Sequence, residues 1–176
     1  MAGWRGILAG KERERRMAKK RVYVETSVIS YLTAWLSNDL ITLARQLLTR
    51  KWWTCREQWE LFISPFVLDE ITEGDVIAAA ERLAAARELP VLPEHQKAKV
   101  TADKLAAEVP IPNTAIADAA HLALSAFHGM DYLVTWNQTH LDNPDLRGKI
   151  EGIIRREGLS PAIVLTPERL LETDHD

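Results

Sequence analysis

The segment 21–32, RVYVETSVISYL, combines two local patterns from which the expected fold follows. The side chains of Arg21–Val24 are mostly β-branched or aromatic, which is typical of a buried strand. Glu25 comes next, and Thr26 and Ser27 then provide an N-cap for a following helix. Open parallel sheets bind their ligands where strands end and helices begin. The Glu25 carboxylate is therefore expected at the functional edge of such a sheet.

Three other polar residues far apart in the chain occupy comparable places. Trp136 and Asn137 directly follow the expected buried strand 131–135, which repeats the arrangement at Glu25. Glu70 lies in a short helix that begins after a Ser-Pro pair, and Asp118 lies about one turn inside a helix that follows the proline-containing segment 110–114. We expect these side chains to converge in one pocket for a divalent metal.

Helices and strands alternate along the remaining chain. The expected helices are 39–59, 66–71, 75–88, 94–109, 114–127, 145–156 and 167–171, and extended segments are expected at 61–63, 89–93, 131–135 and 162–165. This alternation predicts one α/β domain, a three-layer α/β/α sandwich with a mainly parallel central sheet.

Two of these helices carry apolar side chains at helical spacing, a pattern typical of helices that pack on a core. The first such set consists of Leu40, Leu43, Leu47 and Leu48. The second consists of Ile116, Ala120, Ala123, Leu124 and Phe127. Asp118 lies off this second stripe.

The composition agrees with one domain that folds without disulfide bonds or structural metal ions. The chain has 176 residues, of which 47% are hydrophobic, enough to bury a core. Its one cysteine, Cys55, excludes an intramolecular disulfide and a zinc ribbon, and we expect a reducing cytoplasm. No apolar run reaches the roughly 20 residues of a membrane span. The formal net charge of −3 offers no global attraction to nucleic acid, although local basic patches can supply it.

Residues 1–20 form a basic extension that is not expected to belong to the fold, whereas 21–176 form the predicted domain. A basic arm for nucleic acid and a transit peptide are both compatible with this composition. A signal peptide is not, because the apolar stretch 6–10 is too short. Our preferred interpretation is that Met17 is the biological start, since it leads directly into the first strand.

Four segments, in this order, resemble the motifs of the PIN-domain ribonucleases, in the branch of VapC-like toxins. They are YVETSV at 23–28, the helix that holds Glu70, IADAAH at 116–121 and YLVTWN at 132–137. The likeness extends over nearly all of the chain from Arg21 to Leu171. It implies a PIN-like fold and a metal-dependent endoribonuclease that is often a dimer and often the toxin of a type II toxin–antitoxin pair. Aspartate is usual in that family where this chain has Glu25 and Asn137.

The chemistry of RNA cleavage explains why oxygen ligands are needed. Attack of water on a phosphodiester requires an activated nucleophile and neutralised phosphoryl oxygens, and hard divalent cations supply both. Glu25, Glu70 and Asp118 are the predicted ligands of Mg²⁺ or Mn²⁺. Asn137 is the fourth predicted catalytic residue, because its carbonyl oxygen can bind the metal or position a water. Asp69, beside Glu70, is expected to face solvent.

Other polar residues are predicted to support these ligands. They are Thr26, Ser27, His121 and Thr135. Thr26 and Ser27 are expected to act first as helix caps, and His121 is expected as a packed or supporting side chain rather than a proton shuttle. His140 and Asp142 are candidates for the rim of the site.

Tryptophans gather in and around the second expected helix, at Trp35, Trp52, Trp53 and Trp59. Trp52 and Trp53 are adjacent and cannot share a helix face, so one of them is expected on the surface. Exposed aromatic side chains stack on RNA bases or fill protein interfaces. An RNA substrate, a helix of a protein antitoxin and a second copy of the chain are therefore the expected partners.

A non-catalytic PIN-like module that binds RNA or protein is the competing interpretation, with Glu25 and Asn137 as marks of a decayed site. Other classes have less support. The chain has no Gly-rich dinucleotide loop and no P-loop, and no lysine ends the expected strand 162–165 as a phosphoacceptor receiver would require. Metal-dependent cleavage of RNA separates the enzyme from the binding module.

Overall fold

The computed structural model describes residues 19–109, 115–137, 141 and 143–173. The strands are β1 (Arg21–Val24), β2 (Glu60–Phe62), β3 (Tyr132–Val134) and β4 (Ile163–Leu165). The helices are α2 (Thr26–Thr33), α3 (Leu40–Thr54), α4 (Pro65–Ile71), α5 (Val76–Ala86), α6 (Gln96–Glu108), α7 (Ala115–Phe127), α8 (Pro144–Arg156) and α9 (Pro167–Glu172). A 3₁₀ turn, η1 (Arg56–Gln58), precedes β2.

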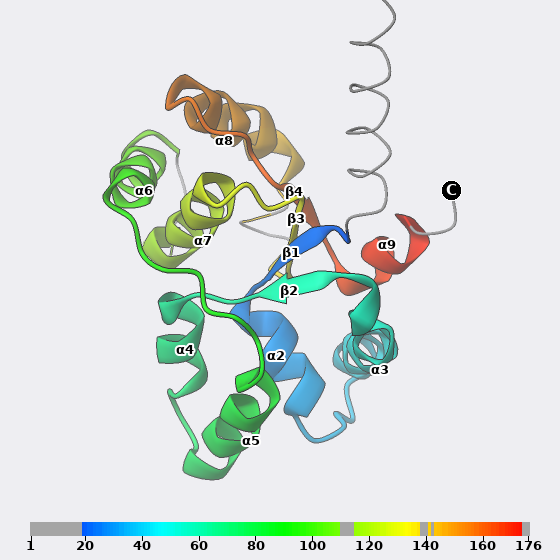
Figure 1. Cartoon of the computed structure of the whole chain (residues 1–176). Coiled ribbons are helices and arrows are strands. Elements are labelled where there is room, and N and C mark those ends of the chain that lie inside the picture. The colour runs from blue at the N-terminus through cyan, green and yellow to red at the C-terminus, as the bar shows by residue number, and fades with distance from the viewer. Residues whose placement is uncertain (1–18, 110–114, 138–140, 142, 174–176) are drawn as a thin grey trace, which may run out of the picture.

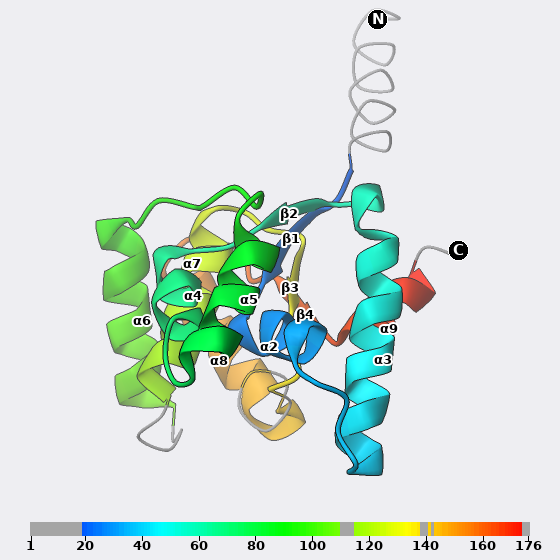
Figure 2. The same cartoon turned by 90° about the horizontal axis from the view of Figure 1, so that it is seen from below.

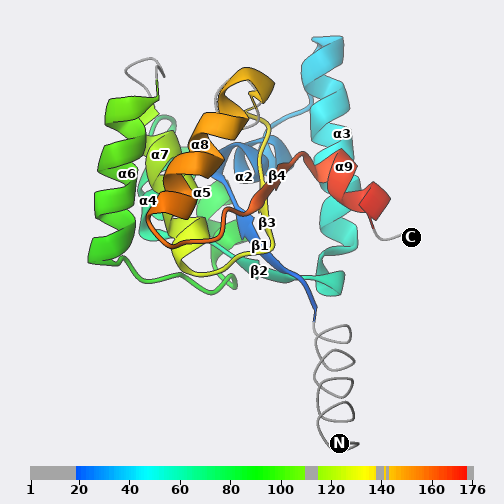
Figure 3. The ribbon, with the colours of Figure 1, turned by 90° about the horizontal axis from the view of Figure 1, so that it is seen from above.

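The described strands form one sheet in the order β2-β1-β3-β4, and every pairing is parallel (Figure 1). Helices α3 and α9 pack together on one side of this sheet, while α4, α6, α7 and α8 lie on the other side (Figure 2). The opposite view shows the same division (Figure 3). The predicted α/β/α sandwich with a parallel sheet is confirmed.

The strand register brings several strand ends to one level. Val24 pairs with Val134, and Val134 pairs with Leu165. The backbone N–H of Glu25 continues the ladder by donating to the Val134 carbonyl at 3.1 Å. Residues that follow β1 and β3 therefore begin side by side, at the carboxyl edge where parallel sheets place their functional side chains.

Helix α2 begins two residues earlier than the capping pattern predicted. Thr26 and Ser27 are its first residues, and Glu25 is the N-cap, since its side chain accepts a hydrogen bond from the Ser27 N–H. A carboxylate is a strong acceptor for the free N–H groups of a first turn and is stabilised by the helix dipole. The proposed cap at Thr26 and Ser27 is thus corrected to Glu25.

The leucine stripe expected on α3 is only partly buried, because Leu40 and Leu47 face solvent while Leu43 and Leu48 are intermediate. Leu40 is 77% exposed and Leu47 is also exposed, whereas Gln46, Thr49 and Trp52 are the buried residues of this helix. Gln46 is buried because its side chain is satisfied on both ends: its amide donates to the Trp35 carbonyl and its oxygen accepts from the Ser37 N–H. The buried face of this helix therefore combines hydrogen-bonded polar side chains with Trp52.

The second stripe and the helix bounds also need correction. Ile116 is 73% exposed, although the rest of its predicted stripe is buried or partly buried. Helix α3 ends at Thr54, before the expected Trp59, because the chain turns through η1 into β2. The expected helix start at 110–114 lies outside the described residues.

The tryptophan side chains in and around α3 differ in burial. Trp52 is completely buried, and Trp53 is half-buried rather than exposed. Their rings are 5.9 Å apart, and the Trp52 ring also lies 5.8 Å from that of Trp59. This aromatic cluster fixes α3 and η1 to the core. Trp35, by contrast, is 88% exposed.

The N-terminal extension lies outside the described residues except for its last two. The Lys20 carbonyl accepts from the Glu60 N–H at 2.9 Å, and the Lys20 ammonium is 3.1 Å from Asp131. The role of 1–16 stays a prediction. Among the described helices, none combines the length and the apolar character that crossing a bilayer requires.

Candidate metal centre

Glu25 is held at the carboxyl end of β1 by donors on both of its oxygens. Oε1 accepts from the Ser27 N–H at 3.1 Å, and Oε2 accepts from the hydroxyls of Ser27 at 2.5 Å and Thr135 at 2.7 Å. The residue is only 6% exposed. These hydrogen bonds fix the rotamer of the carboxylate.

Glu70 reaches the same place from α4. Its Oε2 accepts hydrogen bonds from the Thr26 hydroxyl and from His121 Nε2, the latter at 3.3 Å. Ligand atoms of Glu25, Glu70 and His121 all lie within 4.8 Å of one another. Within the described part of the chain, both contacts of Glu70 fall on Oε2, which leaves Oε1 available to a ligand. The side chain of Glu70 is partly exposed, so this trio is open to solvent on its side.

A buried chain of hydrogen bonds holds the imidazole of His121. Its Nδ1 is 2.6 Å from the hydroxyl of Tyr23 on β1, which is 2.6 Å from the Ser64 hydroxyl. Ser64 also caps α4 by accepting from the Val67 N–H. These contacts direct Nε2 of His121 toward Glu70. Neither Tyr23 nor Ser64 was expected at the site, because a tyrosine in a strand and a serine before a proline carry no such signal in the sequence.

Asp118 and Asn137 form a second pair beside the trio. Asn137 Nδ2 donates to Asp118 Oδ1 at 2.9 Å, and the Asn137 N–H donates to the Thr135 hydroxyl at 2.8 Å. Since that hydroxyl donates to Glu25, the pair and the trio are joined through Thr135. Asp118 is 6% exposed, which is consistent with a carboxylate turned toward the interior of the site.

The structure thus brings all four residues predicted as catalytic to one edge of the sheet. Asp118, predicted as a ligand beside Glu25 and Glu70, lies next to the trio in which His121 is the third member, and its role as a ligand stays a prediction. The predicted supporting residues Thr26, Ser27 and Thr135 each donate to a carboxylate. Whether these residues act in catalysis stays a prediction.

Three neighbouring expectations lie outside this centre. Asp69 is exposed, as expected. His140 and Asp142 lie outside the described residues.

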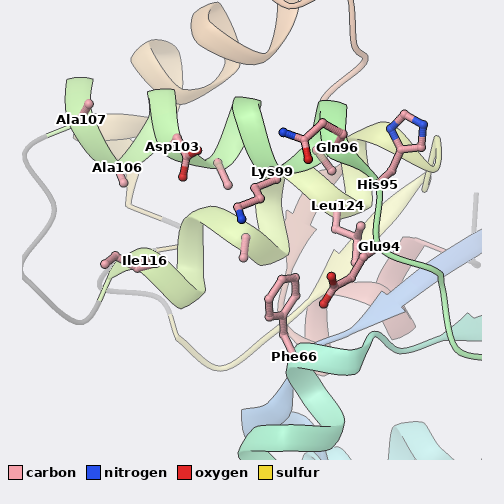
Figure 4. Close-up of a pocket in the computed structure, with 13 residues that line it drawn as sticks. Phe66, Glu94, His95, Gln96, Lys99, Asp103, Ala106, Ala107, Ile116 and Leu124 are labelled. Atoms are coloured by element: carbon pink, nitrogen blue, oxygen red, sulfur yellow. The ribbon is translucent and has the colours of Figure 1, made fainter.

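A separate cavity of about 950 Å³ lies between α6 and α7, and Phe66 lines it at one side (Figure 4). None of the carboxylates of the centre lines that cavity, so the donor chemistry rather than cavity size identifies the candidate site.

Burial and charge act against each other on the pKa values of the centre. Burial favours neutral imidazole, but the hydrogen bond to Glu70 and the charges of Glu25, Glu70 and Asp118 outweigh it and raise the pKa of His121. Burial would raise the pKa of Glu70, yet the hydrogen bond and charge of His121 and the hydrogen bond from Thr26 lower it. Both directions describe an imidazolium paired with a carboxylate.

This pairing predicts how stability depends on pH in chelator-treated protein. The contribution of His121 is fully present below its unfolded pKa, near 6.5, and is lost as pH rises through its raised folded pKa. The contribution of Glu70 is present above its unfolded pKa and is lost as pH falls through its lowered folded pKa. Urea unfolding should therefore show stability declining above about pH 6.5. Glu70→Gln should flatten that decline, and an unchanged slope in this variant would contradict the pairing.

The donor set fits a hard divalent cation. Carboxylate oxygens are the ligands that Mg²⁺ and Mn²⁺ prefer, and an imidazole nitrogen adds affinity for transition metals. Glu25 already has donors that orient it, as ligating carboxylates usually do. Glu25, Glu70 and His121 are thus the residues that could hold such an ion, with the Asp118 charge beside them.

Comparison with known proteins bears on the fold. No protein-family model matches this chain, and no match was found among curated proteins. VapC20 of Mycobacterium tuberculosis, a sarcin–ricin-loop-cleaving toxin, is similar in structure with a TM-score of 0.50. It is 19% identical, over 64% of this chain and 86% of its own.

VapBC2 of Rickettsia felis, solved with a DNA fragment from its promoter, gives a TM-score of 0.52 at 13% identity. That match covers 83% of this chain and 98% of the other. The chain has a VapC-like PIN fold. At these sequence identities the similarity to the VapC proteins shows the fold alone, because one fold can host different activities.

Proposed function

We propose that this VapC-like protein is a metal-dependent endoribonuclease. The observation that carries the proposal is the convergence of Glu25, Glu70 and His121 within 4.8 Å, beside the Asp118–Asn137 pair. Clustered carboxylates with fixed rotamers, at the carboxyl edge of a parallel sheet, are suited to bind a cation and a phosphate together. The sequence motifs and the fold support the same reaction class.

The residues of the centre have separable roles in this proposal. Glu25, Glu70 and His121 would hold Mg²⁺ or Mn²⁺, with Asp118 as the adjoining carboxylate. A bound ion would neutralise charge on the phosphoryl oxygens and lower the pKa of water toward neutrality. Ser27 and Thr135 hold the Glu25 carboxylate in one orientation, and Asn137 does the same for Asp118.

A protein partner is part of the proposal. The similarity to VapBC2 supports a toxin that pairs with an antitoxin, and exposed apolar side chains support a protein interface on this chain. They surround the start of α3 and are Trp35, Leu36, Leu40, Ile41 and Leu47. An antitoxin helix or a second copy would cover such a surface. An RNA substrate and a single cysteine fit action in the cytoplasm.

The test of the proposed function is cleavage of RNA under metal control. Purified protein should cleave single-stranded oligoribonucleotides with Mg²⁺ or Mn²⁺, lose that activity in excess chelator, and regain it when metal is restored. Metal at a hundred times its dissociation constant should also stabilise the fold by about 2.7 kcal/mol, which thermal unfolding can measure. Metal-independent binding of RNA without cleavage would instead support the non-catalytic PIN-like module.

A further inference from the structure

An arginine lies over two aromatic rings beside the candidate centre. The Arg45 guanidinium on α3 is 5.6 Å from the ring centroid of Trp136 and 6.0 Å from that of Tyr31. Its Nη1 also donates to the Tyr31 hydroxyl at 3.3 Å. Both distances are within the range of cation–π contacts, so the rings restrict where this guanidinium can lie.

The rings themselves are fixed to the centre. The Trp136 N–H donates to the Ser27 hydroxyl at 2.9 Å, and that hydroxyl donates to Glu25. The Trp136 indole N–H donates to Thr49 at 2.7 Å. Tyr31 belongs to α2, which begins at the Glu25 cap, and its ring is 6.0 Å from that of Trp136. Arg45 is therefore positioned by the same elements that position a predicted metal ligand.

Arg45 interacts electrostatically with the exposed Asp39 at the N-cap of α3, but the two side chains do not form an ion pair. Among the residues that the structure describes, no carboxylate lies within 4.0 Å of its guanidinium, and its only hydrogen bond goes to the neutral Tyr31. Arg50, on the same helix, instead donates to the carbonyls of Leu32 and Ala34. A guanidinium has five donors in a planar fork, and that geometry matches a phosphate. Arg45 keeps most of these donors for a ligand.

We propose that Arg45 binds a phosphate of the RNA backbone next to the one that is cleaved, with Tyr31 and Trp136 holding the guanidinium in place. This inference rests on the proposed function. The carboxylates of the centre repel a polyanion, so a fixed cation at the edge of the site offsets that repulsion and sets the path of the strand. Because the contact lies outside the reacting phosphate, Arg45 is a positioning residue.

The test compares Arg45→Met with a matched control, Arg56→Met. Arg56 also lies over a tryptophan, at 5.3 Å from the Trp53 ring, but it precedes β2 and so lies at the opposite edge of the sheet. Both changes are made in an Asp118→Asn background, and binding of a labelled single-stranded oligoribonucleotide is measured in chelator across a salt series. Arg45→Met should weaken binding about tenfold and make the slope of log K against log salt shallower by about 0.7. Arg56→Met should change neither.

Steady-state cleavage with Asp118 intact separates positioning from packing. Arg45→Met should raise KM with little change in kcat, because a contact outside the reacting phosphate contributes equally to ground and transition states. Arg45→Lys, which keeps the charge, should recover part of the affinity and all of the salt slope. Arg45→Gln serves the same purpose if the methionine variant does not fold.

Two outcomes would overturn the inference. One is that charge-removing variants of Arg45 bind RNA with the parent's affinity and salt slope, which would mean that Arg45 only covers Trp136. The other is that the parent protein does not bind RNA. Failure of the proposed function looks different, because it appears as RNA binding without chelator-sensitive cleavage, and in that case the effect of Arg45 on binding remains measurable.

Discussion

Asp118→Asn should reduce metal-dependent cleavage of RNA about a hundredfold or more while the fold persists. The change removes a charge from a side chain that is 6% exposed and sits beside the trio of possible ligands. It scarcely alters shape, and an amide oxygen at this position can still accept the hydrogen bond from Asn137. The measurement is the single-turnover cleavage rate with saturating Mn²⁺, together with the melting temperature.

Asp69→Asn is the matched control for this prediction. Asp69 is adjacent to Glu70 on α4 but is exposed, so the control removes the same charge outside the centre. Its cleavage rate should equal that of the parent. If Asp118→Asn cleaves as fast as the parent, the assignment of Asp118 to the centre fails.

Asn137→Asp extends the same experiment. Two carboxylates would then face each other across the present 2.9 Å hydrogen bond, so the metal-free protein should be less stable. Metal binding should tighten, because a fourth carboxylate adds charge to the site, and activity should hold or rise. Tighter metal binding with retained activity would show that the native centre is a weakened form of a metal site with four carboxylates. Loss of metal binding would argue against this interpretation.

Trp52→Ala should lower the free energy of unfolding by about 3–5 kcal/mol. The Trp52 side chain is completely buried and packs between the rings of Trp53 and Trp59, where it ties α3 to η1 and the sheet. Its indole N–H has no hydrogen-bond partner among the described residues, so the loss would come from packing and the cavity rather than from a broken hydrogen bond. Urea unfolding at fixed pH in chelator provides the measurement.

Trp35→Ala is the control, since Trp35 is 88% exposed. It should change stability by no more than about 0.5 kcal/mol, as is usual for a surface substitution. Equal losses in the two variants would show that Trp35 is covered in solution, as it would be in a dimer. A small loss in Trp52→Ala would contradict the packing of α3 described above.

Local sequence patterns predict the order of strands and helices along the chain and the residues at their junctions. Glu25 directly follows an apolar strand and Asn137 lies three residues beyond the end of another, and parallel pairing places such junctions at one edge of the sheet. Glu70 and Asp118 could be placed near that edge because each lies in a helix that follows an expected boundary. These features depend on chain-local patterns and on the geometry of parallel sheets, and both can be recognised in a single sequence.

Contacts between side chains of distant segments could not be predicted from these patterns and required the three-dimensional structure. His121 takes a place beside Glu25 and Glu70 because α7 turns it toward Tyr23, 98 positions away in the chain. Arg45 likewise contacts Trp136 from a distant segment of the chain, and α3 buries Gln46, Thr49 and Trp52 while its Leu40 and Leu47 face solvent. Contacts between distant segments depend on the rotation of each helix about its axis and on the sheet register. A turn of a few tens of degrees changes the partner of a side chain without changing any local sequence pattern, so periodicity cannot determine these contacts.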